Sequence, residues 1–229
     1  MYLARVVKAI EEAQGGGRNI QSATAAPLVP PRPTLNKLKD AARGCRACPL
    51  WKTGTQTVFG EGRPSASIVF VGEQPGNDED LAGKPFVGPA GKLLDRALAE
   101  AGIDRQEAYV TNAVKHFKWE PKGKRRIHKK PSAREIAACR PWLEAELAVL
   151  KPKVLVCLGA TAAQALLGKE FRVSRQRGQV VTSNLAANVT ATVHPSSILR
   201  APDDETRRNE MALFIKDLKV VAKLIQKSE

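Results

Sequence analysis

Residues 67–76 read Ser67-Ile68-Val69-Phe70-Val71-Gly72-Glu73-Gln74-Pro75-Gly76, a short apolar run that ends in a polar turn. A run of this length, rich in β-branched residues and closed by Pro and Gly, is typical of a buried strand. Three further runs of the same kind follow at 108–114, 154–159 and 189–193, and a weaker one covers 178–183. We therefore expect segment 67–76 to contain the first strand of a sheet.

Helical patterns separate the predicted strands. They cover 91–101, 132–150 and 161–167, and a last amphipathic pattern runs from about 205 to 226. Strands that alternate with helices indicate an α/β fold whose mostly parallel sheet is covered on both faces. Ligands of such sheets bind at the carboxyl ends of the strands, so a site is expected in the loops that follow them.

The first 33 residues differ from the rest in composition. Residues 2–13 have the spacing of a short amphipathic helix, but Gly15-Gly16-Gly17 and Pro30-Pro31-Arg32-Pro33 are typical of a linker. We expect an N-terminal extension and flexible linker over 1–33, and a folded domain over 34–229 whose first helix is capped by Thr34. Such an extension can connect the domain to an upstream module.

The charge balance favours a polyanionic partner. The chain carries 37 Lys and Arg against 23 Asp and Glu, a formal net charge of +14, and each cation that neutralises a phosphate releases a counterion. No apolar run is long enough to span a bilayer, and Glu11 and Glu12 follow the first apolar patch, unlike a signal peptide. We therefore expect a cytoplasmic, monomeric protein that binds nucleic acid and no membrane.

Four cysteines in a reducing compartment suggest metal or redox chemistry more than disulfides. Cys45 and Cys48 form a C-x-x-C pair, Cys139 lies in a predicted helix and Cys157 in a predicted strand. Zinc and a [4Fe–4S] cluster both fit two clustered and two distant thiols. The second pair lacks the short spacing of a zinc ribbon, which favours iron–sulfur, and a buried unligated thiol stays open for Cys157.

The turn after the first strand places a carboxylate and an amide beside Gly72, at Glu73 and Gln74. This turn is not a G-x-G-x-x-G fingerprint, which disfavours dinucleotide binding. The loop continues over 83–91, where Phe86 stands among small residues and a flat ligand could stack on it. A polar surface turn and a core aromatic residue are the alternatives for these positions.

Asn112 ends the second predicted strand, and His194 follows the last. An Asn amide both donates and accepts hydrogen bonds, which suits the edge of a base. After His194 come hydroxyls, two apolar residues and an arginine, an order that suits a loop entering a DNA groove, where an apolar side chain replaces an extruded base. The expected DNA contacts in this loop are Ser196, Ser197, Leu199 and Arg200. A turn Asn and a proline-stiffened surface loop are the alternatives.

Taken in order, these motifs resemble the uracil-DNA glycosylase superfamily in its iron–sulfur family 4 branch, from about Leu35 to the C-terminus. The resemblance implies a three-layer α/β fold, with a central mostly parallel sheet flanked by helices, and a pocket for uracil in DNA. The implied [4Fe–4S] cluster is held by Cys45, Cys48, Cys139 and Cys157. The implied uracil contacts are Gly72, Gln74, Phe86, Asn112 and His194.

Two departures resemble a subgroup, the UdgX-type uracil-DNA-binding proteins. Gln74 stands where family 4 proteins usually have Ala, and a basic loop, 122–130, contains the run Lys124-Arg125-Arg126-Ile127-His128. This resemblance implies that the protein excises uracil and is then captured, with His128 as the nucleophile that bonds to the deoxyribose C1′. The implied catalytic residues are then His128, Glu73, Gln74 and His194.

The residues are compatible with that chemistry. From Lys115 to Arg134, nine residues are Lys or Arg and only Glu120 is acidic. We therefore expect the loop to lie against phosphates. The expected DNA contacts here are Lys124, Arg125, Arg126, Lys129 and Lys130. Glu73 could stabilise a cationic sugar while His194 and Asn112 bond the departing base. A neutral imidazole held nearby can react before water does.

Two other functions stay open at this stage. In an ordinary turnover uracil-DNA glycosylase, water attacks the sugar and His128 only contacts phosphate. In a non-catalytic nucleic-acid-binding module, the cluster would only stabilise the fold, and the pocket residues would be unnecessary. We expect uracil-containing DNA as the partner, single strands preferred, and His116 as the histidine without a role at the pocket.

Overall fold

A five-stranded sheet forms the centre of the computed structural model, which describes residues 24–226; the helix expected over 2–13 lies outside that range. The strand order is β2-β1-β5-β7-β6. The strands are β1 (Ile68–Gly72), β2 (Ala108–Asn112), β5 (Val154–Leu158), β6 (Val180–Ser183) and β7 (Ala186–Thr192). All neighbours are parallel except β6, which pairs antiparallel to β7 at the edge. The expected mostly parallel α/β sheet is confirmed.

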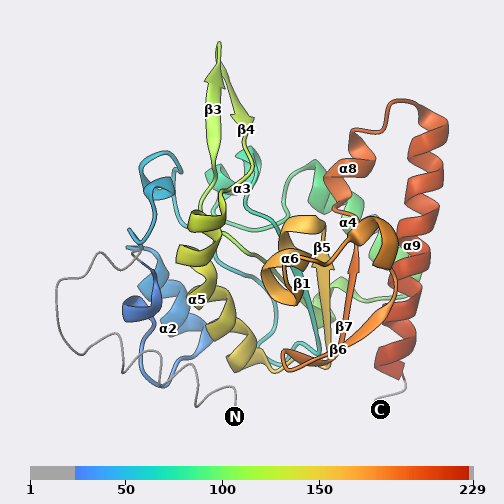
Figure 1. The fold of residues 1–229 in the computed structure, drawn as a ribbon, viewed down its shortest axis with the longest axis horizontal. Coiled ribbons are helices and arrows are strands. Elements are labelled where there is room, and N and C mark those ends of the chain that lie inside the picture. The colour runs from blue at the N-terminus through green and yellow to red at the C-terminus, as the bar shows by residue number, and fades with distance from the viewer. Residues whose placement is uncertain (1–23, 227–229) are drawn as a thin grey trace.

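Helices cover both faces of the sheet (Figure 1). Successive side chains of β1 point to opposite faces of the sheet, and each set is buried under helices. Ile68 and Phe70 face the core under α4 (Pro89–Ala101) and α9 (Asp204–Gln226). Val69 and Val71 face the core under α5 (Ala133–Leu150) and α6 (Ala160–Leu167), and none of the four residues is more than 1% exposed. The helices are α2 (Leu35–Ala42), α3 (Asn77–Ala82), α4 (Pro89–Ala101), α5 (Ala133–Leu150), α6 (Ala160–Leu167), α7 (Val173–Gln176), α8 (Pro195–Leu199) and α9 (Asp204–Gln226). Short 3-10 turns cover Ala26–Leu28, Pro49–Lys52 and Arg105–Glu107. None of the helices between residues 24 and 226 is long and apolar enough to cross a membrane.

The folded domain begins earlier than Thr34. Thr34 caps α2 as expected, since its side chain accepts a hydrogen bond from the Lys37 N–H. Ahead of it, Ala25 is fully buried and donates its N–H to the Ala138 carbonyl at 2.8 Å, and Val29 is 7% exposed. These small apolar residues fit against α5, so the part of the predicted linker that the structure describes belongs to the domain.

A buried ion pair joins the end of β2 to α5. Lys115 and Glu146 are 1% and 0% exposed and are in direct contact. The ammonium of Lys115 also donates to the Asn112 carbonyl at 2.8 Å and to Thr111 at 2.7 Å, and Glu146 accepts from Tyr109 at 2.8 Å. Buried charges persist only when paired and hydrogen-bonded, so this network fixes the main chain where β2 ends.

The basic loop after β2 is a β-hairpin. Strands β3 (Trp119–Lys122) and β4 (Arg125–His128) pair antiparallel, with Trp119 opposite His128. The hairpin projects away from the body of the domain (Figure 1). A run of mostly exposed cations has none of the alternation by which a half-buried strand is recognised, and for this reason the sequence pattern predicted only a loop.

Gln74 anchors the base of this hairpin. Its amide nitrogen donates to the carbonyls of Lys118 and Lys129 at 3.2 and 3.1 Å, and its amide oxygen accepts from the Lys118 N–H at 3.1 Å. The Lys129 N–H also donates to the Lys118 carbonyl at 3.0 Å, so one side chain from the β1 loop reinforces the backbone bond that joins the two hairpin arms. Gln74 also lines the cavity described below, so the uracil contact expected for it stays a prediction beside this structural role.

Arg126 anchors the other side of the hairpin. Its guanidinium bonds Asp80 at 2.6 Å and the Asn77 side chain at 2.8 Å, both from α3. Asp80 is fully buried, so this carboxylate needs a charged partner. The cation also lies over the rings of Phe117 and Trp119. Arg126 was expected to contact DNA, but these partners hold it against the protein.

Replacing Gln74 with Ala should loosen the hairpin while leaving the domain folded. Three hydrogen bonds at a partly buried position are lost, and the local cost is about 1–3 kcal/mol. Hydrogen–deuterium exchange should therefore speed up by about tenfold or more in peptides covering 118–129, with little change in the sheet. Glu120→Ala is the control, because it removes only the exposed pair with Lys129. Equal exchange in both variants would contradict the anchor.

Candidate active site

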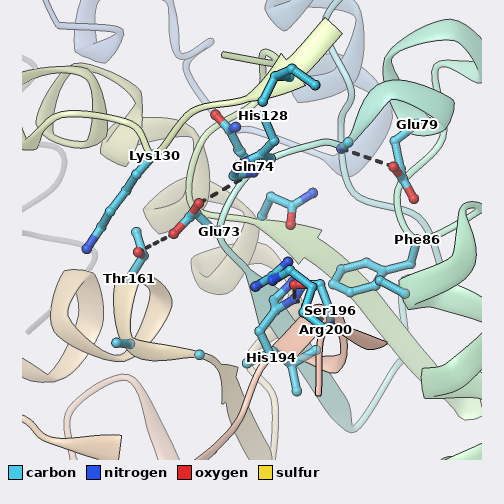
Figure 2. Close-up of a pocket in the computed structure, with 17 residues that line it drawn as sticks. Glu73, Gln74, Glu79, Phe86, His128, Lys130, Thr161, His194, Ser196 and Arg200 are labelled. Carbon is cyan, nitrogen blue, oxygen red and sulfur yellow. Dashed lines mark hydrogen bonds and ion pairs between the residues drawn. The ribbon is translucent and has the colours of Figure 1, made fainter. Parts of the chain in front are cut away.

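A cavity of about 630 Å³ opens at the carboxyl ends of the strands. It lies beside β1, where the strand order reverses: β2 is on one side of β1 and β5 is on the other. This switch point is where α/β sheets bind ligands. The loops after β1, β5 and β7 supply Glu73, Thr161 and His194, and the hairpin supplies His128 (Figure 2). The other lining residues are Gln74, Gly76, Glu79, Phe86, Ala90, Asn112, Ile127, Lys130, Leu158, Gly159, Ala160, Ser196 and Arg200.

The carboxylate of Glu73 lies between two partners. The Thr161 hydroxyl donates a short hydrogen bond to one oxygen, and the other oxygen lies 3.5 Å from Nε2 of His128 (Figure 2). Thr161 lies in the first turn of α6 and is itself 6% exposed, so it holds the carboxylate from the protein side. The Glu73 charge is thereby aimed at the imidazole and at the space between them.

His128 is held in its neutral form. Burial against the pocket lowers the pKa of the imidazole below its ordinary value; the Glu73 charge raises the pKa and the Arg200 charge lowers it. The Phe117 ring lies 6.0 Å away, between centroids. About half of the His128 side chain stays exposed, at 49%. A neutral imidazole keeps one unprotonated nitrogen, which is what a nucleophile needs.

His194 is neutral with a defined tautomer. Burial lowers the pKa of this imidazole to about 4, and the charge of Arg200 acts in the same direction. Its Nδ1 accepts the Ser196 N–H at 3.2 Å and also contacts the Ser196 hydroxyl at 2.8 Å. Because Nδ1 accepts, the ring proton is on Nε2, which can donate into the pocket.

Phe86 and Asn112 form the inner wall of the pocket. Phe86 stacks on His194 with 6.1 Å between centroids and adopts a positive φ of 56°, which is rare for an aromatic residue. Gly72 makes room for both side chains: a Cβ there would lie 2.4 Å from Oδ1 of Asn112 and 2.8 Å from the Phe86 ring. Gly72 therefore shapes the pocket through its lack of a side chain.

The remaining predicted DNA contacts surround the pocket mouth. Lys124 and Arg125 are exposed near the hairpin tip, Lys129 pairs with Glu120 at 2.8 Å, and Lys130 and Arg200 line the cavity. Ser196 bonds His194, Ser197 donates to the His194 carbonyl at 2.8 Å, and Leu199 is 39% exposed. His116 lies away from the cavity, buried and bonded to Thr57 at 3.0 Å.

Three site residues carry no recognisable sequence signal. Thr161 follows β5 in a run of small residues that predicts only a helix start. Glu79 is 8% exposed and joins two loops, accepting the N–H of Gly76 at 3.0 Å and of Gly88 at 2.8 Å. Asp80, the partner of Arg126, follows it in the same acidic run, which on its own is typical of a solvated turn.

Three of the four cysteines lie together. Cys45 and Cys139 are buried in one core cluster, against which the partly buried Cys48 packs. Each sulfur faces an N–H: Trp142 Nε1 donates to Cys45 at 3.3 Å, the Lys115 N–H to Cys139 at 3.2 Å, and the Leu50 N–H to Cys48. Burial raises the pKa of Cys139 to about 12. Hydrogen bonds to sulfur are a feature of cluster-ligating thiolates.

Cys157 does not belong to this group. It lies in β5, fully buried in the separate core cluster under α5 and α6, where burial raises its pKa to about 12 with no contribution from another thiol. The strand register places it opposite Val71 and Ala191, whereas the other three cysteines belong to or pack against a different core cluster. The assignment of Cys157 as a ligand is therefore not supported, because its side chain faces a different apolar layer.

The three thiols are not arranged around a single ion. Among residues 24–226, no group of three or more His, Cys, Asp or Glu side chains could hold one metal ion. An iron–sulfur cluster is larger than an ion and keeps its ligands further apart. Three thiols with an N–H at each sulfur are a donor set that an iron–sulfur cluster can use.

Comparison with known proteins gives the family. The model of the family "Uracil DNA glycosylase superfamily" matches residues 59–219. The type-4 uracil-DNA glycosylase of Thermotoga maritima is 38% identical over 191 residues, which is 83% of this chain and 94% of the relative. The type-4 enzyme of Archaeoglobus fulgidus is 41% identical over 178 residues, 73% of this chain and 86% of the relative.

A more distant relative is similar over a shorter part. The type-5 uracil-DNA glycosylase of Thermus thermophilus is 34% identical over 140 residues, which is 55% of this chain and 59% of the relative. The family match spans the sheet, the pocket loops and most of α9, so it covers the residues that form the cavity. The chain belongs to the uracil-DNA glycosylase superfamily and is similar to its type-4 members.

Proposed function

We propose that this protein excises uracil from DNA and is captured by its own product through His128. The excision is supported by the family and by the pocket, in which Asn112 and the Nε2–H of His194 can bond the base and Phe86 can stack on it. One observation carries the capture: a hairpin brings the neutral imidazole of His128 to 3.5 Å from the carboxylate of Glu73.

The chemical step needs both groups at the sugar. As the C1′–N1 bond breaks, its electron pair leaves with uracil, whose negative charge is stabilised by His194, Asn112 and the nearby Arg200. Glu73 stabilises the positive charge that develops on the sugar. The unprotonated nitrogen of His128 then forms a bond to C1′. The imidazolium loses its remaining N–H proton to solvent, and the uracil anion takes up a proton from solvent.

DNA binding follows from the cations around the pocket mouth. Lys124, Arg125, Lys129, Lys130 and Arg200 can each neutralise a phosphate, and the exposed Leu199 beside them can fill the space of an extruded base. A uracil must leave the base stack to reach a pocket at this depth, and an unpaired strand reduces that cost. We therefore propose single-stranded, uracil-containing DNA as the preferred substrate.

The three grouped thiols would hold a [4Fe–4S] cluster. Cys45, Cys48 and Cys139 would supply three ligands, so the fourth would come from a residue other than Cys157. Such a cluster would fasten the segments before β1 to α5 and takes no part in the steps above.

The capture is tested with His128→Ser. The wild type should give a species with uracil-containing single strands that survives SDS and heat, whereas the variant should give free uracil and an abasic strand with turnover, because water reaches C1′ instead. Denaturing gels and release of labelled uracil measure both products. Arg125→Ser, on the same hairpin but exposed, should still form the adduct. An adduct in His128→Ser would place the nucleophile elsewhere, and wild-type turnover without adduct would favour an ordinary glycosylase.

The rate of adduct formation should resist mild acid. Both imidazoles act as neutral groups with lowered pKa values, so the rate is lost only as the pH falls through those lowered values. At pH 6 an ordinary imidazole would be only about one quarter neutral, whereas a larger fraction of this rate should remain at that pH because both pKa values are lowered. Arg200→Gln removes a charge that lowers both pKa values, so its rate should begin to fall at higher pH. A half-loss near pH 6.5 in the wild type would contradict the assignment.

Cysteine variants should distinguish the cysteines that would hold the cluster from one that does not bind it. Cys48→Ala should lose bound iron and the broad visible absorption of a cluster, because one of the thiolates that would hold the cluster is missing. Cys157→Ala should keep both, with only the modest loss of stability expected for a small cavity. Iron analysis and a visible spectrum of the purified proteins measure this. Loss of the chromophore in Cys157→Ala alone would restore that residue as a ligand.

A further inference from the structure

A second hollow lies beside the pocket, between α4 and α9. It encloses about 510 Å³. Its floor is apolar, formed by Leu93, Met211, Ala212 and Ile215. Its rim carries four cations and one carboxylate, from Lys92, Arg96, Arg207, Arg208 and Glu100. We refer to these residues, with Pro89 and Leu199, as the α4–α9 groove.

The groove is continuous with the uracil pocket along the chain. Pro89 and Leu199 line the groove, and their immediate neighbours Ala90 and Arg200 line the pocket. Helix α8 therefore forms the divide between the two. In Figure 1 the hairpin, α8 and the first turns of α9 lie along the same end of the molecule. A strand whose uracil sits in the pocket can thus pass over α8 into the groove.

The charges of the rim are available to a ligand. Lys92 and Arg208 have no ion pair among residues 24–226. Arg96 and Arg207 pair with Glu100 and Asp204, but the four side chains are 44–77% exposed, and exposed pairs of this kind contribute little energy. A phosphate can therefore displace these carboxylates.

We propose that the α4–α9 groove binds the DNA strand beyond the uracil, a proposal that rests on the proposed function. Cations on the rim would meet phosphates, and the apolar floor would meet bases, the combination that single-stranded DNA requires. Along α4 the groove runs from Pro89 to Glu100, about 16 Å at 1.5 Å per residue, which gives room for more than one nucleotide. An acidic peptide would also match the charge, but continuity with the pocket favours DNA.

The test compares a long and a short strand. The long strand carries uracil with about ten nucleotides on each side, and the short strand has about one on each side. The double variant Lys92→Glu/Arg208→Glu reverses two rim charges. The control Lys216→Glu/Lys219→Glu makes the same charge change at exposed positions of α9 outside the groove. Single-turnover excision gives, for each protein and strand, the maximal rate and the protein concentration at half of that rate.

The half-saturating concentration of the groove variant should rise about tenfold or more on the long strand, with its maximal rate unchanged. Both parameters should equal those of the control on the short strand. An equal rise in the half-saturating concentration on both strands would show that the effect comes from net charge alone, and it would overturn the proposal. No rise on the long strand would also overturn it and leave an acidic peptide as the better occupant.

A binding measurement keeps the test independent of excision. Fluorescence anisotropy with a thymine-containing strand of the long length gives the slope of log affinity against log salt concentration. The slope should be less steep for the groove variant than for the control by about 1.4, since two phosphate contacts are lost and each contributes about 0.7 on a single strand. If the wild type excised no uracil from either strand, the proposed function would fail, and this slope alone would decide whether the groove binds DNA.

Discussion

The buried ion pair between Lys115 and Glu146 determines where the pocket is built. Both side chains are shielded from solvent, and their other hydrogen bonds go to β2, to the Asn112 carbonyl at its end and to the Gly60 N–H. Removing one partner of such a pair leaves an unpaired buried charge and costs about 3–5 kcal/mol. Because Lys115 bonds the Asn112 carbonyl and its N–H reaches the Cys139 sulfur, the same few residues position the inner wall of the pocket and contact the thiol group. The sheet, the pocket and the thiols are therefore mechanically connected.

The two features that depart from the family 4 pattern act together. Gln74 and the basic hairpin are far apart in the sequence, but the amide of Gln74 bonds both arms of the hairpin. An Ala at this position could not supply those bonds, and the hairpin would then be held mainly by Arg126 and its buried partner Asp80. The residue next to the pocket carboxylate thus controls the element that carries His128. A change in either feature is expected to affect the other, because the Gln74 amide is hydrogen-bonded to both hairpin arms.

The sheet and most of the pocket could be predicted from the sequence, because β1 and its neighbours are buried on both faces and end in polar residues whose places follow from strand order. Other assignments depended on contacts between distant segments. Cys157 faces a different core from the other thiols, which no spacing rule can reveal. Arg126 looks like its neighbouring cations in sequence, and only the buried carboxylate of Asp80 makes it an anchor. Thr161 is one small polar residue among others until the fold places it against Glu73.

In the proposed mechanism, capture requires both the nucleophile His128 and a hairpin that holds it rigidly. Water is abundant at an open pocket, and half of the His128 side chain is exposed to it. A group held in line with a reacting atom can nevertheless act as if present at about 10⁵–10⁸ M, far above the concentration of water. That advantage exists only while the imidazole stays close to C1′, so it depends on the bonds that Gln74 and Arg126 make to the hairpin. In the proposed mechanism the hairpin anchors would therefore set the partition between hydrolysis and capture, although neither anchor needs to touch the reacting sugar.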